Sequence, residues 1–187
     1  MIDLQVILIC GGSCSGKSTL AHSFKNSIVI ELDSFYRPIE QIPKDKNGNP
    51  DWDRPECIDV AECGEAVQAL IKYHKTAIPE YSMKENRRVG MRNITLDSNI
   101  KFIVIEGIFS FFPPLYELGN LKIFMDTPTE IRVSRRISRD IERKGFSHTE
   151  ILMSFMTAEE NYHKYIEPMK EKADLIIPFS ANPIKML

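Results

Sequence analysis

The residues with the clearest chemical meaning form a loop that follows an apolar run near the start of the chain. Val6–Cys10 is continuously apolar, and the pattern G-x-x-x-x-G-K-[ST] extends from Gly11 to Ser18. Glycines let backbone N–H groups turn toward an anion, and a helix beginning near Lys17 adds the positive end of its dipole. A nucleoside triphosphate is therefore expected to bind at Gly11, Gly12, Ser13, Cys14, Ser15, Gly16, Lys17, Ser18 and Thr19.

Two side chains at the end of this loop carry the chemistry of phosphate binding. Lys17 is expected to place its charge beside the β- and γ-phosphates, and Ser18 offers a hydroxyl ligand for Mg²⁺. A Gly- and Ser-rich surface loop that matches the pattern by chance is the alternative. The motif lies between a strand pattern and an amphipathic helix pattern, which disfavours that alternative.

Two carboxylates directly follow further apolar runs. Asp33 comes after Ile28–Leu32, and Glu106 comes after Phe102–Ile105. Asp33 has the chemistry to accept a proton from a substrate hydroxyl or to bind Mg²⁺, with a helix cap as the alternative. Glu106 lies at the end of a buried strand, where an unpaired charge is costly. A second acidic group near Mg²⁺ explains Glu106 better than a structural role.

A predicted helix over Thr129–Arg143 carries a stripe of arginines. Four of them recur at helical spacing, namely Arg132, Arg136, Arg139 and Arg143. The helix follows a strand that ends at Asp126, so the stripe is expected to lie over the phosphate site and to stabilise a transferring phosphoryl group. The alternative is a solvated face, partly neutralised by Asp140 and Glu142.

The elements that position these residues follow from hydrophobic patterning. Predicted parallel strands, each too short for a helix, are Val6–Cys10, Ile28–Leu32, Phe102–Ile105, Leu121–Met125 and Leu175–Ile177. Predicted helices between them cover 17–25, 60–73, 129–143 and 149–167. The alternation predicts an α/β fold of the P-loop NTPase type, a five-stranded parallel sheet with helices on both faces. Its carboxyl rim would carry Gly11, Asp33, Glu106 and Asp126.

Two segments break the alternation, at about 37–59 and about 78–96. The first is rich in proline and contains the turn cluster Asn47–Pro50, and the second has partial alternation that favours a β-ribbon. Long insertions in a compact domain are often substrate-binding loops, and we expect that role here, with structural padding as the alternative.

Composition bounds the remaining choices. A chain of 187 residues predicts a single domain over residues 1–187, and a net charge of −2 gives no general attraction to nucleic acid or to an anionic membrane. The N-terminus lacks the features of a signal peptide or membrane span, so a cytoplasmic location is expected. The four cysteines have no metal-binding spacing and are expected to be reduced.

A phosphate loop alone does not separate kinases from GTPases or transporter ATPases. The chain has no N-K-x-D signature for guanine and no Gly-rich transporter signature, which favours a kinase. Its motifs, in order, resemble the uridine kinase family, which is related to phosphoribulokinase and nicotinamide riboside kinase. The matching segments are Gly12–Ser18, Asp33–Arg37, Asp51–Pro55, Ile78–Tyr81, Ile105–Ile108, Arg132–Asp140 and Ile166–Pro178.

The resemblance implies a phosphotransferase that uses ATP and Mg²⁺ and transfers the γ-phosphate to the 5′-hydroxyl of a nucleoside. It implies that Lys17 contacts the ATP phosphates and that Ser18 and Glu106 hold Mg²⁺. Asp33 would be the general base and would also approach the metal. The small-molecule partner would enter beside a substrate-binding insertion and an Arg-rich lid.

On the acceptor side, the resemblance assigns one residue to the sugar and several to the pocket around it. Asp53 would hold the ribose hydroxyls, and Tyr36 and Tyr81 would line the nucleoside pocket. Arg136 and Arg139 would reach the substrate and the phosphates from the lid helix.

The departures from the family lie on the base side. Asn86 stands where the family usually has a histidine, although its amide could serve a different edge of the base. Lys144–Phe146 replaces an Arg-Gly-Arg sequence, and Ser154 replaces a glutamine. The likeness therefore supports phosphoryl transfer better than pyrimidine recognition. The chain also ends at Leu187, without the family's terminal helix, so an oligomer contact or one exposed flank of the sheet is expected.

Two alternatives stay open at this point. One is a kinase of a related metabolite, such as nicotinamide riboside or a sugar phosphate, and the turn Asp45–Gly48 resembles some nicotinamide riboside kinases. The other is a nucleotide-binding protein without turnover, which the set of Lys17, Ser18, Asp33 and Glu106 argues against. The acceptor, the choice between ATP and GTP, and the formation of a homo-oligomer are not determined by the sequence.

Overall fold

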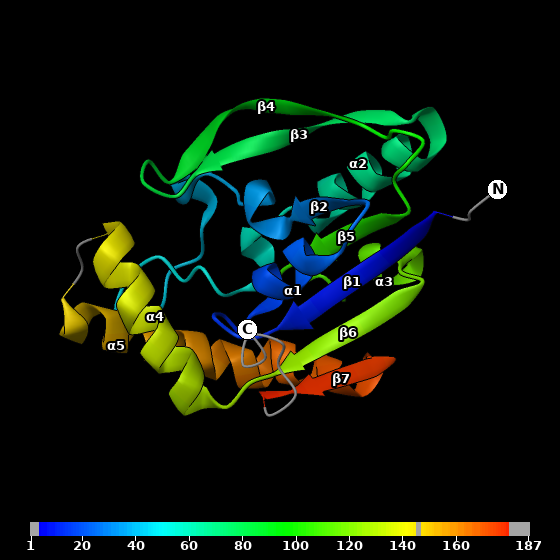
Figure 1. The fold of residues 1–187 in the computed structure, drawn as a ribbon. Helices are drawn as coiled ribbons and strands as arrows, with labels where there is room; N and C mark the ends of the chain where they lie inside the picture. The colour runs from blue at the N-terminus through cyan, green and yellow to red at the C-terminus, as the bar shows by residue number, and fades with distance from the viewer. Residues whose placement is uncertain (1–3, 145–146, 180–187) are drawn as a thin grey trace.

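The computed structural model describes residues 4–144 and 147–179. Its centre is a five-stranded sheet in which every neighbouring pair of strands is parallel, in the order β2-β5-β1-β6-β7 (Figure 1). The predicted parallel sheet is confirmed. Its strands are β1 Gln5–Gly11, β2 Ser27–Glu31, β5 Phe102–Glu106, β6 Leu121–Asp126 and β7 Leu175–Pro178.

The central strands are apolar along their whole length because both faces of the sheet are covered. Leu8 and Cys10 of β1 pack into one core with Leu70 of helix α2, while Ile7 packs into a second core with Ala21 of helix α1. Figure 1 shows α1 on one side of the sheet and α2 on the other. The sheet is thus the middle of three layers, and its carboxyl rim is left free for the site.

The helices have the following bounds: α1 Lys17–Ser23, α2 Val60–Tyr73, α3 Leu115–Leu118, α4 Thr129–Lys144 and α5 His148–Asn161. Short 3₁₀ turns cover Leu32–Phe35, Ile39–Gln41 and Pro55–Cys57. The single predicted helix over 149–167 is wrong from residue 162 onward, because α5 gives way to a π-helix at Tyr162–Ile166 and a 3₁₀ helix at Glu167–Lys172. Pro168 lacks an N–H group, so an α-helical ladder cannot continue through it.

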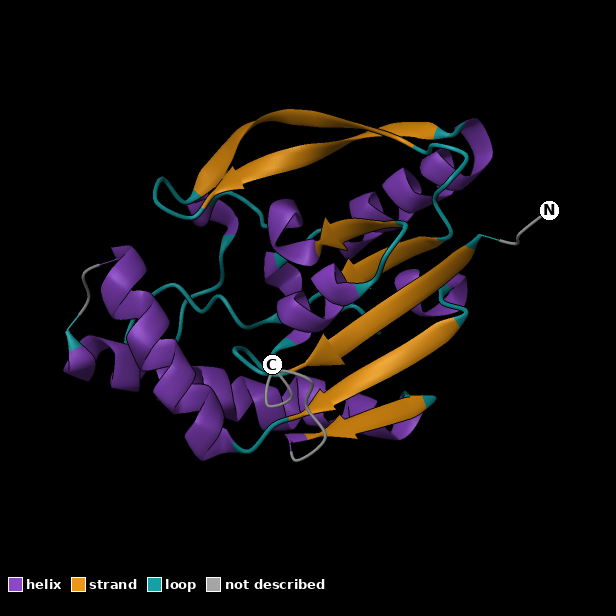
Figure 2. Ribbon diagram, in the orientation of Figure 1, coloured by secondary structure: helices purple, strands orange, loops and turns teal. Residues whose placement is uncertain are grey.

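The predicted β-ribbon is a two-stranded antiparallel hairpin of β3 (Lys75–Ser82) and β4 (Arg87–Thr95), which begins earlier than expected. The hairpin stands beside β2 and α2 (Figure 2). Ile78 and Ile94 are buried in the same core as Leu70 of α2. The register shifts between Glu80 and Tyr81, near the tip of the hairpin.

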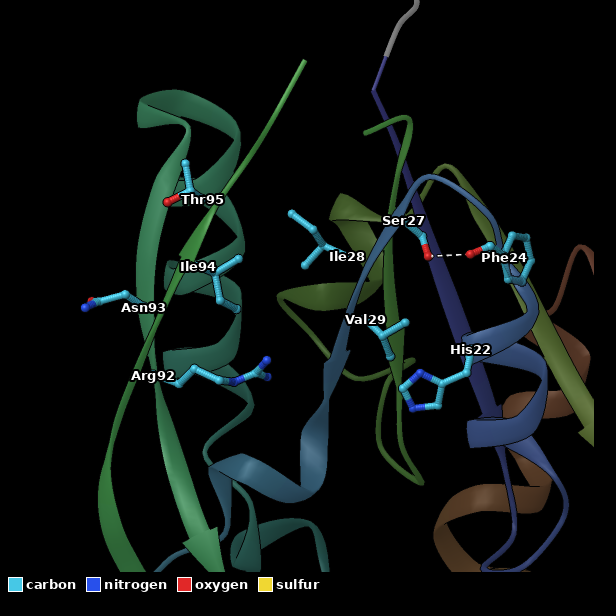
Figure 3. A pocket seen from close by; sticks show the side chains of 9 residues that line it. All are labelled: His22, Phe24, Ser27, Ile28, Val29, Arg92, Asn93, Ile94 and Thr95. Carbon is cyan, nitrogen blue, oxygen red and sulfur yellow. Dashed lines mark hydrogen bonds between the residues drawn. The ribbon is translucent and has the colours of Figure 1, made fainter. Parts of the chain in front are cut away.

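A groove of about 550 Å³ lies between the sheet edge and this hairpin. It is bordered by the end of α1, the first part of β2 and the last part of β4, as Figure 3 shows. The lining residues are His22, Phe24, Ser27, Ile28, Val29, Arg92, Asn93, Ile94 and Thr95. They include no residue of the phosphate loop, so the groove is separate from the rim where the candidate site lies. Within residues 4–144 and 147–179, no helix has the length and apolarity needed to cross a bilayer.

Candidate active site at the carboxyl rim

The phosphate loop connects β1 to α1 and is shaped by close contacts with its surroundings. Gly11 has φ of +146°, and a Cβ there would meet the carbonyl oxygen of Met125 at 2.7 Å. A Cβ on Gly12 would meet the guanidinium of Arg132 at 2.8 Å. The Nζ of Lys17 donates to the carbonyl of Gly12 at 2.9 Å, so the lysine already lies over the loop. Glycine at 11 and 12 is therefore a packing requirement of this loop.

Three side chains from the β6–α4 region hold the backbone of the loop. Thr127 Oγ1 donates to the carbonyl of Ser15 at 2.9 Å, and Arg135 Nη1 donates to the carbonyl of Cys14 at 3.2 Å. Arg132 is only 2% exposed and is packed against Gly12. These contacts fix the loop before any phosphate binds, as preorganised anion sites require.

Arg132 was expected in the basic stripe over the phosphates, but its guanidinium is committed to protein partners. Its Nη2 donates to Glu159 at 2.6 Å and its Nε donates to the carbonyl of Thr127 at 3.0 Å. The guanidinium carbon lies 4.1 Å from the ring centroid of Tyr162. Arginine spacing alone could not reveal this, because Glu159 and Tyr162 come from a different helical segment. The side chain of Arg143 lies outside the described part of the structure.

The site expected to bind Mg²⁺ contains a close pair of oxygen atoms. Ser18 Oγ donates to Glu106 Oε1 at 2.7 Å, and Glu106 is buried at the end of β5. Hydroxyl and carboxylate oxygens are the ligands that Mg²⁺ prefers, and proteins usually complete its shell with water and substrate phosphates. Among residues 4–144 and 147–179 there is no group of three or more His, Cys, Asp or Glu that could hold a metal ion. The hydroxyl of Ser18 and the carboxylate of Glu106 are ligands of the kind that fit magnesium.

Asp33 follows β2 in the first 3₁₀ turn and keeps its side chain in contact with solvent. The protein atoms around it still reduce its hydration, and this desolvation, reinforced by the charge of Glu106, raises its pKa from 3.8 to about 6. Lys17 and Arg139 act in the opposite direction. A carboxylate with this pKa is charged at neutral pH and a better base than an ordinary aspartate.

The expected acceptor pocket contains a cluster of three aromatic rings. The ring of Tyr36 lies with its centroid 5.7 Å from that of Trp52 and 5.7 Å from that of Tyr81. The hydroxyl of Tyr36 donates to the carbonyl of Trp52 at 3.3 Å. Burial raises the pKa of Tyr36 well above its usual value and that of Tyr81 to about 12, so both phenols stay neutral. Tyr36 is buried within this cluster, and Trp52 and Tyr81 are partly exposed.

Asp53 connects this pocket to the arginines of α4. Its Oδ2 lies 3.9 Å from Nη1 of Arg136. Desolvation raises the pKa of Asp53, while the charge of Arg136 opposes the shift. Asp140 places one oxygen 3.6 Å from Nε of Arg136 and the other 2.8 Å from Nε of Arg139. The structure therefore brings Asp53, Arg136 and Arg139, three residues that the resemblance assigns to the substrate, into one cluster.

The base-side departures lie on different elements. Asn86 is at the end of the hairpin with φ of +51°, and its carbonyl accepts from the N–H of Ile39 at 3.3 Å. Ser154 is exposed on α5, where its hydroxyl donates to the carbonyl of Ile151 at 3.0 Å. Gly145 and Phe146 lie outside the described residues. Asp126 is the last residue of β6, and its Oδ2 accepts from the Nζ of Lys170 at 2.6 Å.

Two features near the acceptor pocket had no sequence signal. The carboxylate of Asp51 is buried and accepts from the amide of Asn161 at 2.7 Å. Arg88 of the hairpin pairs with Glu62 of α2. Both contacts join segments that are far apart in the sequence, and neither follows a short-range spacing.

The topology, the phosphate loop and the rim carboxylates are those expected of a kinase of the P-loop class. The model of the phosphoribulokinase / uridine kinase family matches residues 6–183, and the chain belongs to this family. It is similar to a uridine kinase of Vibrio campbellii, with 31% identity over 92% of this chain and 86% of the relative. It is also similar to uridine-cytidine kinase B of Dictyostelium discoideum, with 32% identity over 96% of this chain and 76% of the relative.

A solved structure shows the same fold. The phosphoribulokinase of Rhodobacter spheroides superposes with a TM-score of 0.65 at 18% sequence identity, covering 98% of this chain and 74% of that one. The family and the two relatives identify the chain as a nucleoside kinase-like phosphotransferase.

Proposed function

We propose that this protein transfers the γ-phosphate of Mg²⁺-ATP to the 5′-hydroxyl of a nucleoside or closely related riboside. One observation carries the proposal. The phosphate loop follows β1, Glu106 is the last residue of β5, and Asp33 lies in the turn after β2, and these three strands are neighbours in the sheet. Parallel strands end at one rim, so the residues that we assign to phosphate, metal and proton transfer lie side by side there.

In this proposal each residue has one task. Lys17 and the loop N–H groups hold the phosphates, and Ser18 with Glu106 holds Mg²⁺, which neutralises phosphate charge when bound. Asp33 accepts the proton of the 5′-hydroxyl while that oxygen forms its bond to the γ-phosphorus and ADP leaves. Arg136 and Arg139 stabilise the negative charge of the transferring group.

The contacts around the acceptor pocket favour an acceptor without a phosphate group of its own. Asp53 has the chemistry to accept hydrogen bonds from ribose hydroxyls, and the rings of Tyr36 and Tyr81 suit a flat base. Three arginines nearby are paired with carboxylates, which leaves their charge partly neutralised. These pairs are Arg37–Asp59, Arg54–Glu56 and Arg88–Glu62. To bind the phosphate group of a sugar phosphate, one of these arginines would first have to leave its carboxylate partner.

The test is a panel of acceptors scored by ADP release with Mg²⁺-ATP. It should include the common ribonucleosides, nicotinamide riboside, ribulose 5-phosphate and fructose 6-phosphate. We expect turnover with ribosides and little with sugar phosphates. Lys17→Ala is the matched control and should lower turnover by about 10²-fold or more, because it removes charge that stabilises the transition state. Turnover confined to sugar phosphates, or none with any acceptor, would contradict the proposal.

A cytoplasmic location and the absence of nucleic-acid and membrane partners stay predictions from composition. The use of ATP rather than GTP rests on the family, and a comparison of the two donors in the same assay tests it. Homo-oligomer formation is measured by light scattering of the purified protein.

A further inference from the structure

Arg88 of β4 joins three segments that surround the aromatic cluster of Tyr36, Trp52 and Tyr81, where we place the acceptor pocket. Its Nη1 and Nη2 donate to Glu62 Oε1 and Oε2 of α2, at 3.1 Å and 2.6 Å. Its Nε donates to the carbonyl of Tyr36 at 3.3 Å. In the hairpin register Arg88 lies opposite Tyr81. A guanidinium bound by two parallel hydrogen bonds to a carboxylate and by a third to a carbonyl holds its partners in one orientation.

These contacts belong to a closed circuit. The hydroxyl of Tyr81 donates to the carbonyl of Arg37 at 3.5 Å, and the guanidinium of Arg37 pairs with Asp59 at 2.8 Å. Asp59 caps α2 by accepting from the N–H of Glu62 at 3.0 Å. Glu62 then returns the circuit to Arg88. The segment that follows β2, the start of α2 and the tip of the hairpin are thereby connected around the pocket.

The hairpin needs such an anchor at its tip. Two strands alone form a marginally stable unit in water, so a hairpin takes its orientation from what it packs against. Away from the tip, Ile78 and Ile94 are buried in the main core. Near the tip, Val89 and Met91 are exposed, and Arg88 supplies the ionic contact with α2. Tyr81 lies in the part of the hairpin that this contact holds.

We propose that Arg88, paired with Glu62, is a positioning residue for the acceptor, and this inference rests on the proposed function. It holds the ring of Tyr81 against that of Tyr36 and so preforms the aromatic wall of the pocket. Loss of the pair lets the hairpin tip leave this position, and acceptor binding must then restore it. The cost appears in the KM for the acceptor, since a less preorganised pocket binds more weakly. The KM for ATP does not depend on the hairpin.

The Arg88–Glu62 pair is partly exposed. Its effect on the acceptor pocket can therefore be separated from an effect on the stability of the whole fold. The side chains of Arg88 and Glu62 are 30% and 33% exposed. Ion pairs of this kind contribute little to global stability. Removing the pair should therefore leave the melting temperature nearly unchanged while the acceptor pocket loosens.

The test compares Arg88→Met with Arg87→Met in the full chain. Arg87 is the adjacent residue, also paired with a carboxylate, Glu85, but exposed at the hairpin tip. We expect Arg88→Met to raise the acceptor KM about tenfold, the equivalent of about 1.4 kcal/mol, with the KM for ATP within about twofold of wild type. Arg87→Met should leave both within about twofold. Equal effects of the two variants, or a matching rise in the KM for ATP, would overturn the proposal.

The charge-reversed pair Arg88→Glu with Glu62→Arg adds a rescue test, since it restores the attraction with the partners exchanged. Recovery of at least part of the acceptor affinity relative to Arg88→Glu alone is expected. If Arg88→Met does not fold, Arg88→Lys keeps the charge and loses the two-bond fork, and should raise the acceptor KM by a smaller factor. An unchanged acceptor KM in a folded Arg88→Lys and no rescue in the reversed pair would both count against the inference.

A readout without substrate separates this inference from the proposed function. Trp52 is the only tryptophan of the chain and packs edge-on against Tyr36. Its fluorescence therefore reports on the pocket directly. We expect Arg88→Met, but not Arg87→Met, to increase quenching of Trp52 by acrylamide. Wild-type protein that phosphorylates no riboside, combined with this change in quenching, would reject the function and keep the positioning role. Unchanged quenching together with normal riboside turnover would keep the proposed function and reject the positioning role of Arg88.

Discussion

The guanidinium of Arg132 and the carboxylate of Glu159 form a buried ion pair, with Nη2 and Oε1 2.6 Å apart and side chains 3% and 15% exposed. The pair connects α4 to α5 directly beside the phosphate loop, because Arg132 also packs against Gly12. Arg132, the first arginine of the basic stripe, therefore supports the phosphate loop in two ways. It packs against Gly12, and it donates to the carbonyl of Thr127, whose hydroxyl holds the carbonyl of Ser15. Arg136, one turn later, lies beside Asp53 and Asp140, and Arg139, two turns later, pairs with Asp140.

The first prediction concerns the stability that this pair provides. Arg132→Met leaves the carboxylate of Glu159 without its buried cation, and breaking a buried pair in this way costs about 3 kcal/mol or more in the free energy of unfolding. Chemical denaturation followed by circular dichroism measures the loss. Arg54→Met is the control, because the Arg54–Glu56 pair is partly exposed and its loss should cost less than about 1 kcal/mol. Equal losses in the two variants would show that Arg132 is not a structural clamp.

The second prediction concerns the magnesium site. Glu106→Gln removes a negative charge but keeps the size of the side chain and an acceptor for Ser18. The Mg²⁺ concentration for half-maximal activity should rise about tenfold or more, since even indirect partners of metal ligands contribute that much to affinity. A magnesium titration at saturating ATP measures the change. Glu117→Gln, on α3, is the control and should leave the titration unchanged.

The third prediction concerns the base. Asp33→Asn keeps the shape of the side chain and removes its ability to accept a proton, so turnover should fall by about 10²-fold or more. Binding of ATP, measured by calorimetry, should change far less. Some loss of metal affinity is compatible with this role, because Asp33 lies near Glu106. Turnover equal to that of wild type would remove Asp33 from the chemistry.

The raised pKa of Asp33 also predicts how stability varies with pH in the metal-free protein. The carboxyl titrates at about 6 in the folded chain, above its ordinary value of 3.8. The folded state therefore binds the proton more tightly, and this contribution to stability is full below the unfolded value and is lost as pH rises through about 6. Asp33→Asn should accordingly melt higher than wild type at neutral pH, and the difference should vanish in acid. Thermal unfolding in the presence of a chelator measures it.

The sheet and the rim could be predicted because their signals are local. The strand over Val6–Cys10 is apolar on both faces, and a parallel sheet demands that pattern. A carboxylate directly after such a strand, like Glu106, must lie at the rim whatever the loops do. The phosphate loop has a fixed spacing because its backbone geometry is fixed.

The ion pairs that support the site could not be predicted from the sequence. Each joins two segments that are far apart in the chain and share no recognisable sequence spacing. Arg132 reaches Glu159 across 27 residues, and Arg88 reaches Glu62 across 26. Each arginine is an ordinary member of a basic run until the tertiary structure supplies its carboxylate. The π-helix at Tyr162–Ile166 is likewise invisible to a 3.6-residue pattern.

The last prediction concerns the base of the acceptor. A pocket that recognises a pyrimidine needs polar partners for the ring edge, and such partners reject analogues that lack the matching groups. Asn86 has a shorter side chain than the histidine that the family usually has, and the hydroxyl of Ser154 already donates within its own helix. Two lost hydrogen bonds at about 1–1.5 kcal/mol each would weaken pyrimidine preference by about 30- to 150-fold.

We therefore expect uridine and cytidine to be poor or unselective substrates, with another riboside used at least as well. Values of kcat/KM for each riboside of the panel measure this directly. Asn86→His should restore part of the preference for uridine, whereas Glu85→His, at the neighbouring exposed position, should not. Uridine that turns over far better than every other riboside in wild type would contradict the prediction, and the protein would then be an ordinary uridine kinase whose base contacts come from other residues.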